Sequence, residues 1–190
     1  MIESAVGYDI AKRGCPDHCG NISLPYPFGI GANCYMNKGF EVSCSKTDDP
    51  PTLLITSLRI EVVDISLDRS AVTVKRPITC QNGSASYPAK LEPVNFTGSP
   101  FESRFPEGQN PALQEHVQDE FIWTITENEA SQIPHKYADA FNCSRSGVRM
   151  SYAALQPQAV RNRIRIERCV CEPGFEGNPY LGCEGKLFSS

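Results

Sequence analysis

Nine cysteines constrain this 190-residue chain more than any other feature of its sequence. They are Cys15, Cys19, Cys34, Cys44, Cys80, Cys143, Cys169, Cys171 and Cys183. Thiols at this density are either cross-linked in an oxidising compartment or bound to metal in a reducing one. Structural zinc sites need close cysteine pairs in matched halves, and the best cluster here, residues 15–19, has no matched half. We therefore expect disulfides and no metal site, with one thiol of the odd set unpaired or bonded to another chain.

Four Asn-x-Ser/Thr tripeptides favour the same oxidising compartment, because such tripeptides are acceptors for N-glycosylation in secreted proteins. They begin at Asn21, Asn82, Asn95 and Asn142. The first 14 residues hold no apolar run of the kind that a secretory signal peptide needs. No apolar stretch of about 20 residues occurs, so we expect no membrane span within the chain and any anchor to lie outside it. These features predict an extracellular protein.

Charge and motifs exclude several classes of function. A net charge of −4 gives no overall attraction to nucleic acid or to anionic membranes. The chain has no Gly-x-Ser-x-Gly elbow, no His-Glu-x-x-His and no phosphate-binding glycine loop. Its three histidines, His18, His116 and His135, are scattered, and acidic pairs such as Asp48-Asp49 are too common to indicate a glycosidase. We expect a protein without catalytic residues.

Hydrophobic alternation predicts a mainly β fold. Apolar and polar residues alternate with period two from Leu58 to Leu67, with a slip at Val62-Val63 that is typical of a β-bulge. Residues 68–70 form a turn, and residues 71–75 return as the partner strand. We also expect strands near Cys34-Tyr35, 40–44, 121–125 and 160–168, and a long loop over 92–112, which is rich in proline and glycine. The predicted fold class is a small, irregular, disulfide-rich extracellular domain with antiparallel hairpins.

The N-terminal motif resembles a known family. Residues 15–34 read Cys-Pro-Asp-His-Cys-Gly-Asn-Ile-Ser-Leu-Pro-Tyr-Pro-Phe-Gly-Ile-Gly-Ala-Asn-Cys, and Phe40-Glu-Val-Ser-Cys44 follows. This order of residues resembles the opening of the galacturonan-binding domain of plant wall-associated receptor kinases. The resemblance covers roughly the first 100 residues and implies a cysteine-rich domain over 15–100 that binds pectin without catalysis.

The C-terminal segment resembles a second element of the same receptors. Cys169-x-Cys171-x-x-Gly-Phe, followed by Gly177-Asn-Pro-Tyr-Leu-Gly-Cys183, is similar to the end of an EGF-like repeat. The resemblance implies that Cys171 pairs with Cys183 and that Cys169 reaches back to Cys143. Only three of the usual six cysteines lie here, and the Gly-Cys motif that the family carries after residue 101 is missing. We therefore divide the chain into 15–100, a divergent loop or linker region over 101–142, and a region over 143–190 that ends in a partial EGF-like element.

Arginine and lysine are the residues that would bind the carboxylates of pectin. In a strand, Arg161, Arg163 and Arg165 would share one face at a spacing of about 7 Å, which suits an extended polyanion but equally an ordinary solvated face. Lys75 and Arg76 form a smaller basic candidate. Tyr26 and Phe28 could stack on a sugar ring, although aromatics between prolines usually pack in a core.

The resemblance implies homogalacturonan as the partner and the cell wall as the location, as the ectodomain of a plasma-membrane protein. No cofactor is expected, and calcium would enter only by bridging carboxylates of bound pectin. A rival interpretation is an ectodomain that recognises a secreted peptide or pathogen protein through an apolar patch. A third is a non-functional fragment, which the missing signal, the odd cysteine and the half repeat would indicate.

Overall fold

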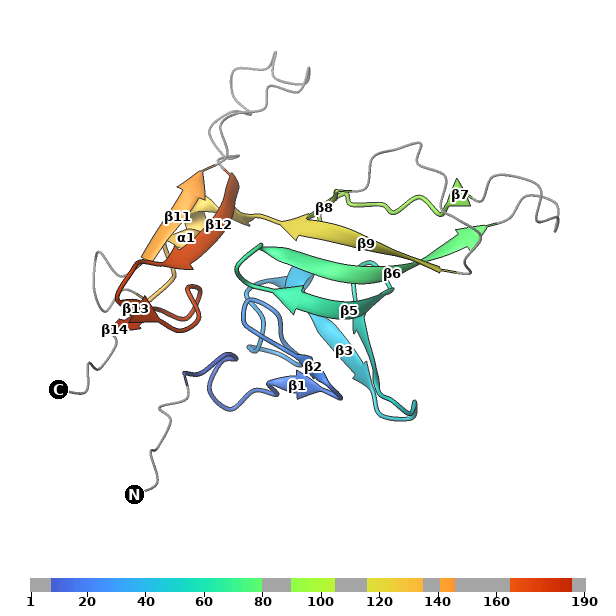
Figure 1. The fold of residues 1–190 in the computed structure, drawn as a ribbon, viewed down its shortest axis with the longest axis horizontal. Helices are drawn as coiled ribbons and strands as arrows, with labels where there is room; N and C mark the ends of the chain where they lie inside the picture. The colour runs from blue at the N-terminus through green and yellow to red at the C-terminus, as the bar shows by residue number, and fades with distance from the viewer. Residues whose placement is uncertain (1–7, 80–89, 105–115, 135–140, 146–164, 186–190) are drawn as a thin grey trace, which may run out of the picture.

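The computed structural model describes residues 8–79, 90–104, 116–134, 141–145 and 165–185 of the chain (Figure 1). The fold is mainly β with antiparallel pairing and disulfides, which confirms the predicted fold class. The main sheet has seven strands, of which six follow one another in the order β3-β4-β5-β6-β9-β8. These six are β3 (Val42–Ser45), β4 (Thr52–Ile55), β5 (Ile60–Ser66), β6 (Ala71–Thr79), β9 (His116–Trp123) and β8 (Phe101–Ser103). The seventh strand, β7 (Lys90–Leu91), pairs with the end of β6.

The β5–β6 hairpin forms as the alternation predicts. Val62 pairs with Val74 and Asp64 with Thr73, so the register shifts between Val62 and Asp64 and the predicted bulge is confirmed. The bulge turns Val63 outward, where it is 37% exposed, while Val62 stays buried. One extra residue on one strand thus reconciles two apolar phases in a single hairpin.

Smaller elements lie at one end of this sheet and below it in the view of Figure 1. A three-stranded antiparallel sheet has the order β10-β12-β11, and a short helix lies beside it. Two small hairpins, each made of two strands of two residues, lie near the N-terminal and C-terminal ends of the sequence. These elements are β1 (His18–Cys19), β2 (Ile22–Ser23), the 3₁₀ helix η1 (Lys38–Phe40), β10 (Ile125–Thr126), α1 (Glu127–Ala130), β11 (Phe141–Arg145), β12 (Arg165–Cys171), β13 (Phe175–Glu176) and β14 (Glu184–Gly185).

Two segments differ from what their local sequence suggests. The region 101–142, expected to be a divergent loop or linker, contributes β8 and β9 to the main sheet, where β9 pairs with β6 from Ala71 to Pro77. No strand forms at Cys34-Tyr35, because the chain bends there and Asn37 caps the following 3₁₀ turn. Long-range pairing decides the first case and a local side-chain cap decides the second.

Eight cysteines form four disulfides in the described part of the chain. The bonds are Cys15–Cys34, Cys19–Cys44, Cys143–Cys169 and Cys171–Cys183. The last two are the pairs that the resemblance implied, and Cys143 and Cys169 face each other directly across β11 and β12. Cys80 lies outside the described residues, so its expected odd status stays a prediction.

The core is an aromatic cluster on the inner face of the main sheet. The Phe28 ring lies 5.3 Å from Phe40, 6.0 Å from Phe101 and 5.1 Å from Trp123, measured between centroids. All four side chains are at most 1% exposed. Phe28 meets Phe40 and Trp123 edge-to-face and stacks on Phe101, and aromatic pairs of both kinds add stability beyond the area that they bury. The proline-rich motif therefore supplies the centre of the core through Phe28.

The C-terminal segment is docked onto this core. Tyr180 is 2% exposed, and its hydroxyl accepts a hydrogen bond from Trp123 Nε1 (3.1 Å) and lies 3.4 Å from Ser70 Oγ. Burial raises the pKa of Tyr180, since a phenolate would be poorly solvated there. The start, middle and end of the described chain thus share one core.

Replacing Tyr180 with phenylalanine should lower the free energy of unfolding by about 1–3 kcal/mol, because the indole N–H of Trp123 loses its buried acceptor. Urea unfolding of the oxidised protein, followed by tryptophan fluorescence, measures this loss. The half-buried Tyr35 offers the control. Tyr35→Phe should change stability by less than about 0.5 kcal/mol. Equal losses in both variants would contradict the docking role of Tyr180.

Candidate functional site

The proline-rich motif itself is buried. Tyr26 is 8% exposed and Phe28 is not exposed at all, so neither ring presents a face on which a sugar could stack. Both aromatic side chains pack in the core, which is the more common role of aromatics between prolines. Gly29 lies so close to the Cys34 backbone that a Cβ atom would overlap the carbonyl group. The motif therefore acts as a platform for the exposed loop that follows it.

That loop, residues 30–38, is held at its middle and in its second half. Cys34 is bonded to Cys15, and the Met36 amide donates to the Pro27 carbonyl (3.0 Å). Gly31 and Asn33 have positive φ angles of 89° and 69°, and both are exposed. The loop bends sharply and presents its backbone to solvent on a cross-linked base.

Lys12 lies over the start of this platform. Its Nζ donates to the Asn33 carbonyl oxygen (3.2 Å) and lies 5.1 Å from the centroid of the Tyr26 ring. No carboxylate lies within ion-pair distance of this ammonium among the residues that the structure describes. A lysine that is held by a carbonyl and an aromatic face can still pair with the carboxylate of a ligand. The neighbouring Arg13 is exposed.

Lys38 lies at the other end of the loop. Its Nζ is 5.2 Å from the centroid of the Tyr35 ring and 3.0 Å from Glu41 Oε1, and its side chain is 76% exposed. Hydrogen bonds to Tyr35 and then to Glu41 raise the pKa of Lys38. The Glu41 pair lies at the surface, where such a pair holds a lysine weakly.

The end of the loop is tied to helix α1. Asn37 Oδ1 accepts from the Gly39 amide (2.7 Å), and Asn37 Nδ2 donates to Glu129 Oε1. Glu129 also accepts from the Thr126 amide (2.7 Å), so the same carboxylate caps α1. Burial first and the charge of Glu129 second raise the pKa of Tyr26, so the tyrosine stays neutral beneath Lys12.

These contacts define a candidate binding surface, which we call the two-lysine surface. Its members flank or form one exposed loop: Lys12, Arg13, Asn33, Tyr35 and Lys38. The sequence analysis did not predict this surface, because it rested on arginines that alternate along a strand. The position of two lysines on either side of the proline-rich motif was the signal in the sequence.

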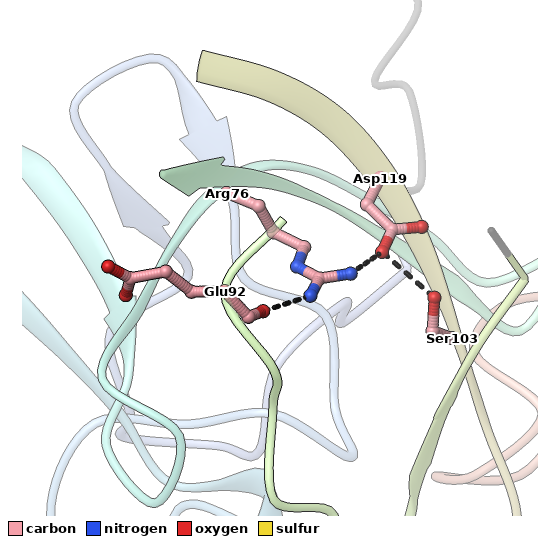
Figure 2. Close-up of polar contacts among 4 residues, drawn as sticks. All are labelled: Arg76, Glu92, Ser103 and Asp119. Atoms are coloured by element: carbon pink, nitrogen blue, oxygen red, sulfur yellow. Dashed lines mark hydrogen bonds and ion pairs between the residues drawn. The ribbon is translucent and has the colours of Figure 1, made fainter. Parts of the chain in front are cut away.

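Arg76, a predicted polyanion-binding residue, is committed to the interior instead (Figure 2). Its side chain is 8% exposed, and its Nη1 lies 2.8 Å from Oδ2 of the fully buried Asp119. Arg76 Nη2 donates to the Glu92 carbonyl, and Ser103 Oγ donates to Asp119 Oδ2 (2.8 Å). Residues 72, 74 and 76 alternate onto the inner face of β6, which takes the guanidinium inward. Arg76 therefore joins β6, β8, β9 and the segment after β7.

Lys75 and Arg165 are the other predicted cationic residues within the described part of the chain. Lys75 points to the opposite face from Arg76, is 39% exposed and pairs with Glu61 (3.4 Å). Arg165 begins β12, where it pairs in register with Thr126. Arg161 and Arg163 lie outside the described residues, so a shared arginine face stays a prediction.

Three predicted glycosylation sites lie on the described surface. Asn21, Asn95 and Asn142 are exposed, and Asn95 Oδ1 accepts from the Thr97 amide (3.0 Å). Asn82 lies outside the described residues. Whether any of the four carries a glycan stays a prediction.

Asp17, His18 and Ser23 form a chain of contacts that resembles the catalytic triad of a hydrolase. His18 Nδ1 lies 3.0 Å from Asp17 Oδ1, and His18 Nε2 lies 3.3 Å from Ser23 Oγ. The hydrogen bond to His18 lowers the pKa of Asp17. The side chains of Asp17 and His18 are 64% and 52% exposed, whereas a working triad buries its carboxylate beside an oxyanion hole. We assign these contacts to the stability of the β1–β2 hairpin.

No group of three or more metal-binding side chains occurs within the described ranges. No helix there has the length and apolar character needed to cross a bilayer.

The N-terminal part of the chain matches a known family. Residues 15–76 match the family described as wall-associated receptor kinase galacturonan-binding. That range contains the proline-rich motif, the exposed loop, Lys38 and the β5–β6 hairpin as far as Arg76, while Lys12 and Arg13 lie just before it. No solved structure matches the chain.

Relatives from Arabidopsis thaliana agree. Wall-associated receptor kinase-like 17 is 37% identical over 92 residues, which are 46% of this chain and 12% of that protein. Wall-associated receptor kinase-like 1 is 39% identical over 101 residues, which are 46% of this chain and 14% of that protein. Wall-associated receptor kinase-like 6 is 28% identical over 196 residues, covering 87% of this chain and 29% of its own length. The chain thus spans less than a third of each of these relatives.

Replacing Arg76 with methionine should lower the free energy of unfolding by about 3–5 kcal/mol, because Asp119 is left as a buried, uncompensated charge. Its neighbour offers a matched control. Lys75→Met removes a half-exposed ion pair and should cost less than about 1 kcal/mol. Denaturant unfolding of both variants makes the comparison, and similar losses would show that Arg76 is not the buried partner.

Proposed function

We propose that this chain, a wall-associated-kinase-type protein with a galacturonan-binding domain in its N-terminal part, is a non-catalytic extracellular module that binds the de-esterified pectin of the cell wall. Homogalacturonan is the proposed ligand. The observation that carries the proposal is the Lys12 ammonium, which is held by a carbonyl and an aromatic ring without a carboxylate in the described structure.

The chemistry of the ligand suits this surface. Each galacturonate unit carries one carboxylate, and lysine ammoniums bind carboxylates through charge-assisted hydrogen bonds. The chain is acidic overall, with a net charge of −4, so only a local cationic site can attract a polyanion. Lys12 and Lys38, one on each side of a fixed loop, supply two such charges.

Arg161, Arg163 and Arg165 remain proposed as a second ionic contact, with Lys75 as a weaker one. An extended polymer can touch several cations at once, and each contact raises the overall affinity. The tests of the two groups are separate, because the arginines and the lysines lie far apart in the sequence.

The described surface favours an ionic ligand over an apolar one. Among the residues that the structure describes, Val63 is the one exposed large hydrophobic side chain. Recognition of a secreted peptide or protein would depend on an exposed apolar patch with aromatic anchors. Protein recognition is therefore the second candidate, and the binding experiment separates it from pectin binding.

The proposed setting is the outer face of the plasma membrane, where the chain would serve as the wall-facing part of a receptor-like kinase. Calcium would take part by bridging carboxylates of bound pectin.

Replacing both lysines should weaken binding of a de-esterified oligogalacturonide by about tenfold, from about 0.7 kcal/mol for each exposed ionic contact. Calorimetry on the secreted, oxidised protein with Lys12→Ala/Lys38→Ala measures the loss. Lys46→Ala is the matched control, because Lys46 is exposed beyond the opposite end of β3 and should leave affinity unchanged.

Binding should also weaken as salt is raised and fail on fully methyl-esterified pectin, because both changes remove ionic attraction. Arg163→Ala/Arg165→Ala tests the arginine contact in the same assay. Full binding by the double-lysine variant would remove the two-lysine surface from the site. No binding by the native protein would contradict the proposed function and favour protein recognition.

A further inference from the structure

We infer that Asn178 is a positioning residue of the two-lysine surface, and that residues 171–183 act as a strap that fixes Lys12 for its ligand. The inference rests on the proposed function, and it concerns a segment far outside the matched residues 15–76. The Asn-Pro-Tyr phrase in this segment belongs to the part of the chain that resembles the end of an EGF-like repeat. Its contacts also join it to the segments around Ile10 and Tyr26.

The side chain of Asn178 joins two backbone segments. It is 3% exposed, and its Nδ2 donates to the carbonyl oxygens of Ile10 (2.8 Å) and Tyr26 (2.7 Å). Its Oδ1 accepts from the Tyr180 amide (2.9 Å). Both amide hydrogens and the amide oxygen of one buried side chain are thus used. Asparagine is the side chain of this length that supplies two donors and one acceptor.

These two segments are the ones that place Lys12. The Tyr26 amide donates to the Ile10 carbonyl (2.8 Å), so that oxygen accepts from Tyr26 and from Asn178 together. Lys12 follows Ile10 by two residues, and its ammonium lies over the Tyr26 ring. Fastening residue 10 to residue 26 therefore sets where the Lys12 side chain can reach.

The strap itself is anchored on several sides. The Cys171–Cys183 bond closes it, and the Leu181 amide donates to the Asn178 carbonyl (2.9 Å) to make a turn. Tyr180 is held in the core by Trp123. The anchors fix the backbone at Asn178, so its side chain is presented in one orientation to the two carbonyls. A preorganised support of this kind keeps a binding group in place without touching the ligand.

A purely structural role for Asn178 predicts a general loss of stability, whereas positioning predicts a specific coupling to Lys12. A double-variant cycle separates the two, because residues that act through one another lose additivity. Lys38 gives the internal comparison, since it is held by Tyr35 and Glu41 rather than by the strap.

The test measures oligogalacturonide affinity for the oxidised native protein and for Asn178→Ala, each with and without Lys12→Ala or Lys38→Ala. In the native background each lysine substitution should weaken binding about threefold. In the Asn178→Ala background the Lys12→Ala effect should shrink below about 1.5-fold, while the Lys38→Ala effect stays near threefold. An unchanged effect of Lys12→Ala would overturn the positioning role.

Two further measurements keep the inference testable. Without ligand, Asn178→Ala should speed hydrogen exchange of the Tyr26 amide by about tenfold or more, and Leu181→Ala should not. If Asn178→Ala fails to fold, exchange in the native protein decides: adding oligogalacturonide should slow exchange of the Tyr180 amide severalfold, and no change would overturn the inference. Failure of the native protein to bind pectin would sink the proposed function, while unaltered Tyr26 exchange would sink the fastening itself.

Discussion

The fold depends on one buried meeting point between three distant parts of the sequence. Phe28 from the proline-rich motif packs edge-on against Trp123 at the end of β9, and the Trp123 indole donates to Tyr180 in the C-terminal strap. None of the three side chains is more than 2% exposed. Because each belongs to a different stretch of the chain, the apolar burial that stabilises the domain cannot be completed by the first 100 residues alone. The four disulfides then cross-link the N-terminal and C-terminal segments that surround this core.

The same arrangement decides which charges are free to act. Arg76 alternates onto the inner face of β6, where Asp119 compensates it, so its charge stabilises the interior and does not reach a ligand. Lys12 and Lys38 extend from loops on the outside of the motif, where an aromatic ring lies beneath each ammonium. A chain with a net charge of −4 can therefore still offer a cationic surface to an acidic polymer. The buried core and the proposed site share Tyr26, which packs below and carries Lys12 above.

Local patterns in the sequence predicted part of this structure well. The β5–β6 hairpin and its bulge follow from apolar alternation, and the Cys143–Cys169 and Cys171–Cys183 bonds follow from the resemblance. The role of Arg76 could not be predicted, because it requires the register between β6 and β9, which are separated by an intervening segment of the chain. The Lys12 site was missed for a similar reason: its position depends on Asn178, 166 residues later in the sequence. Side-chain hydrogen bonds over such separations leave no periodic pattern.

The central claim is that galacturonate carboxylates lie against Lys12 and Lys38. Zero-length carbodiimide cross-linking of a de-esterified oligogalacturonide to the oxidised protein, followed by peptide mass spectrometry, tests it directly. The coupling joins a carboxylate to an amine only when the two are in contact. The account predicts amide bonds at Lys12 and Lys38 that excess free oligogalacturonide suppresses. Adducts at Lys46 or Lys75 with both of these lysines unmodified would contradict it.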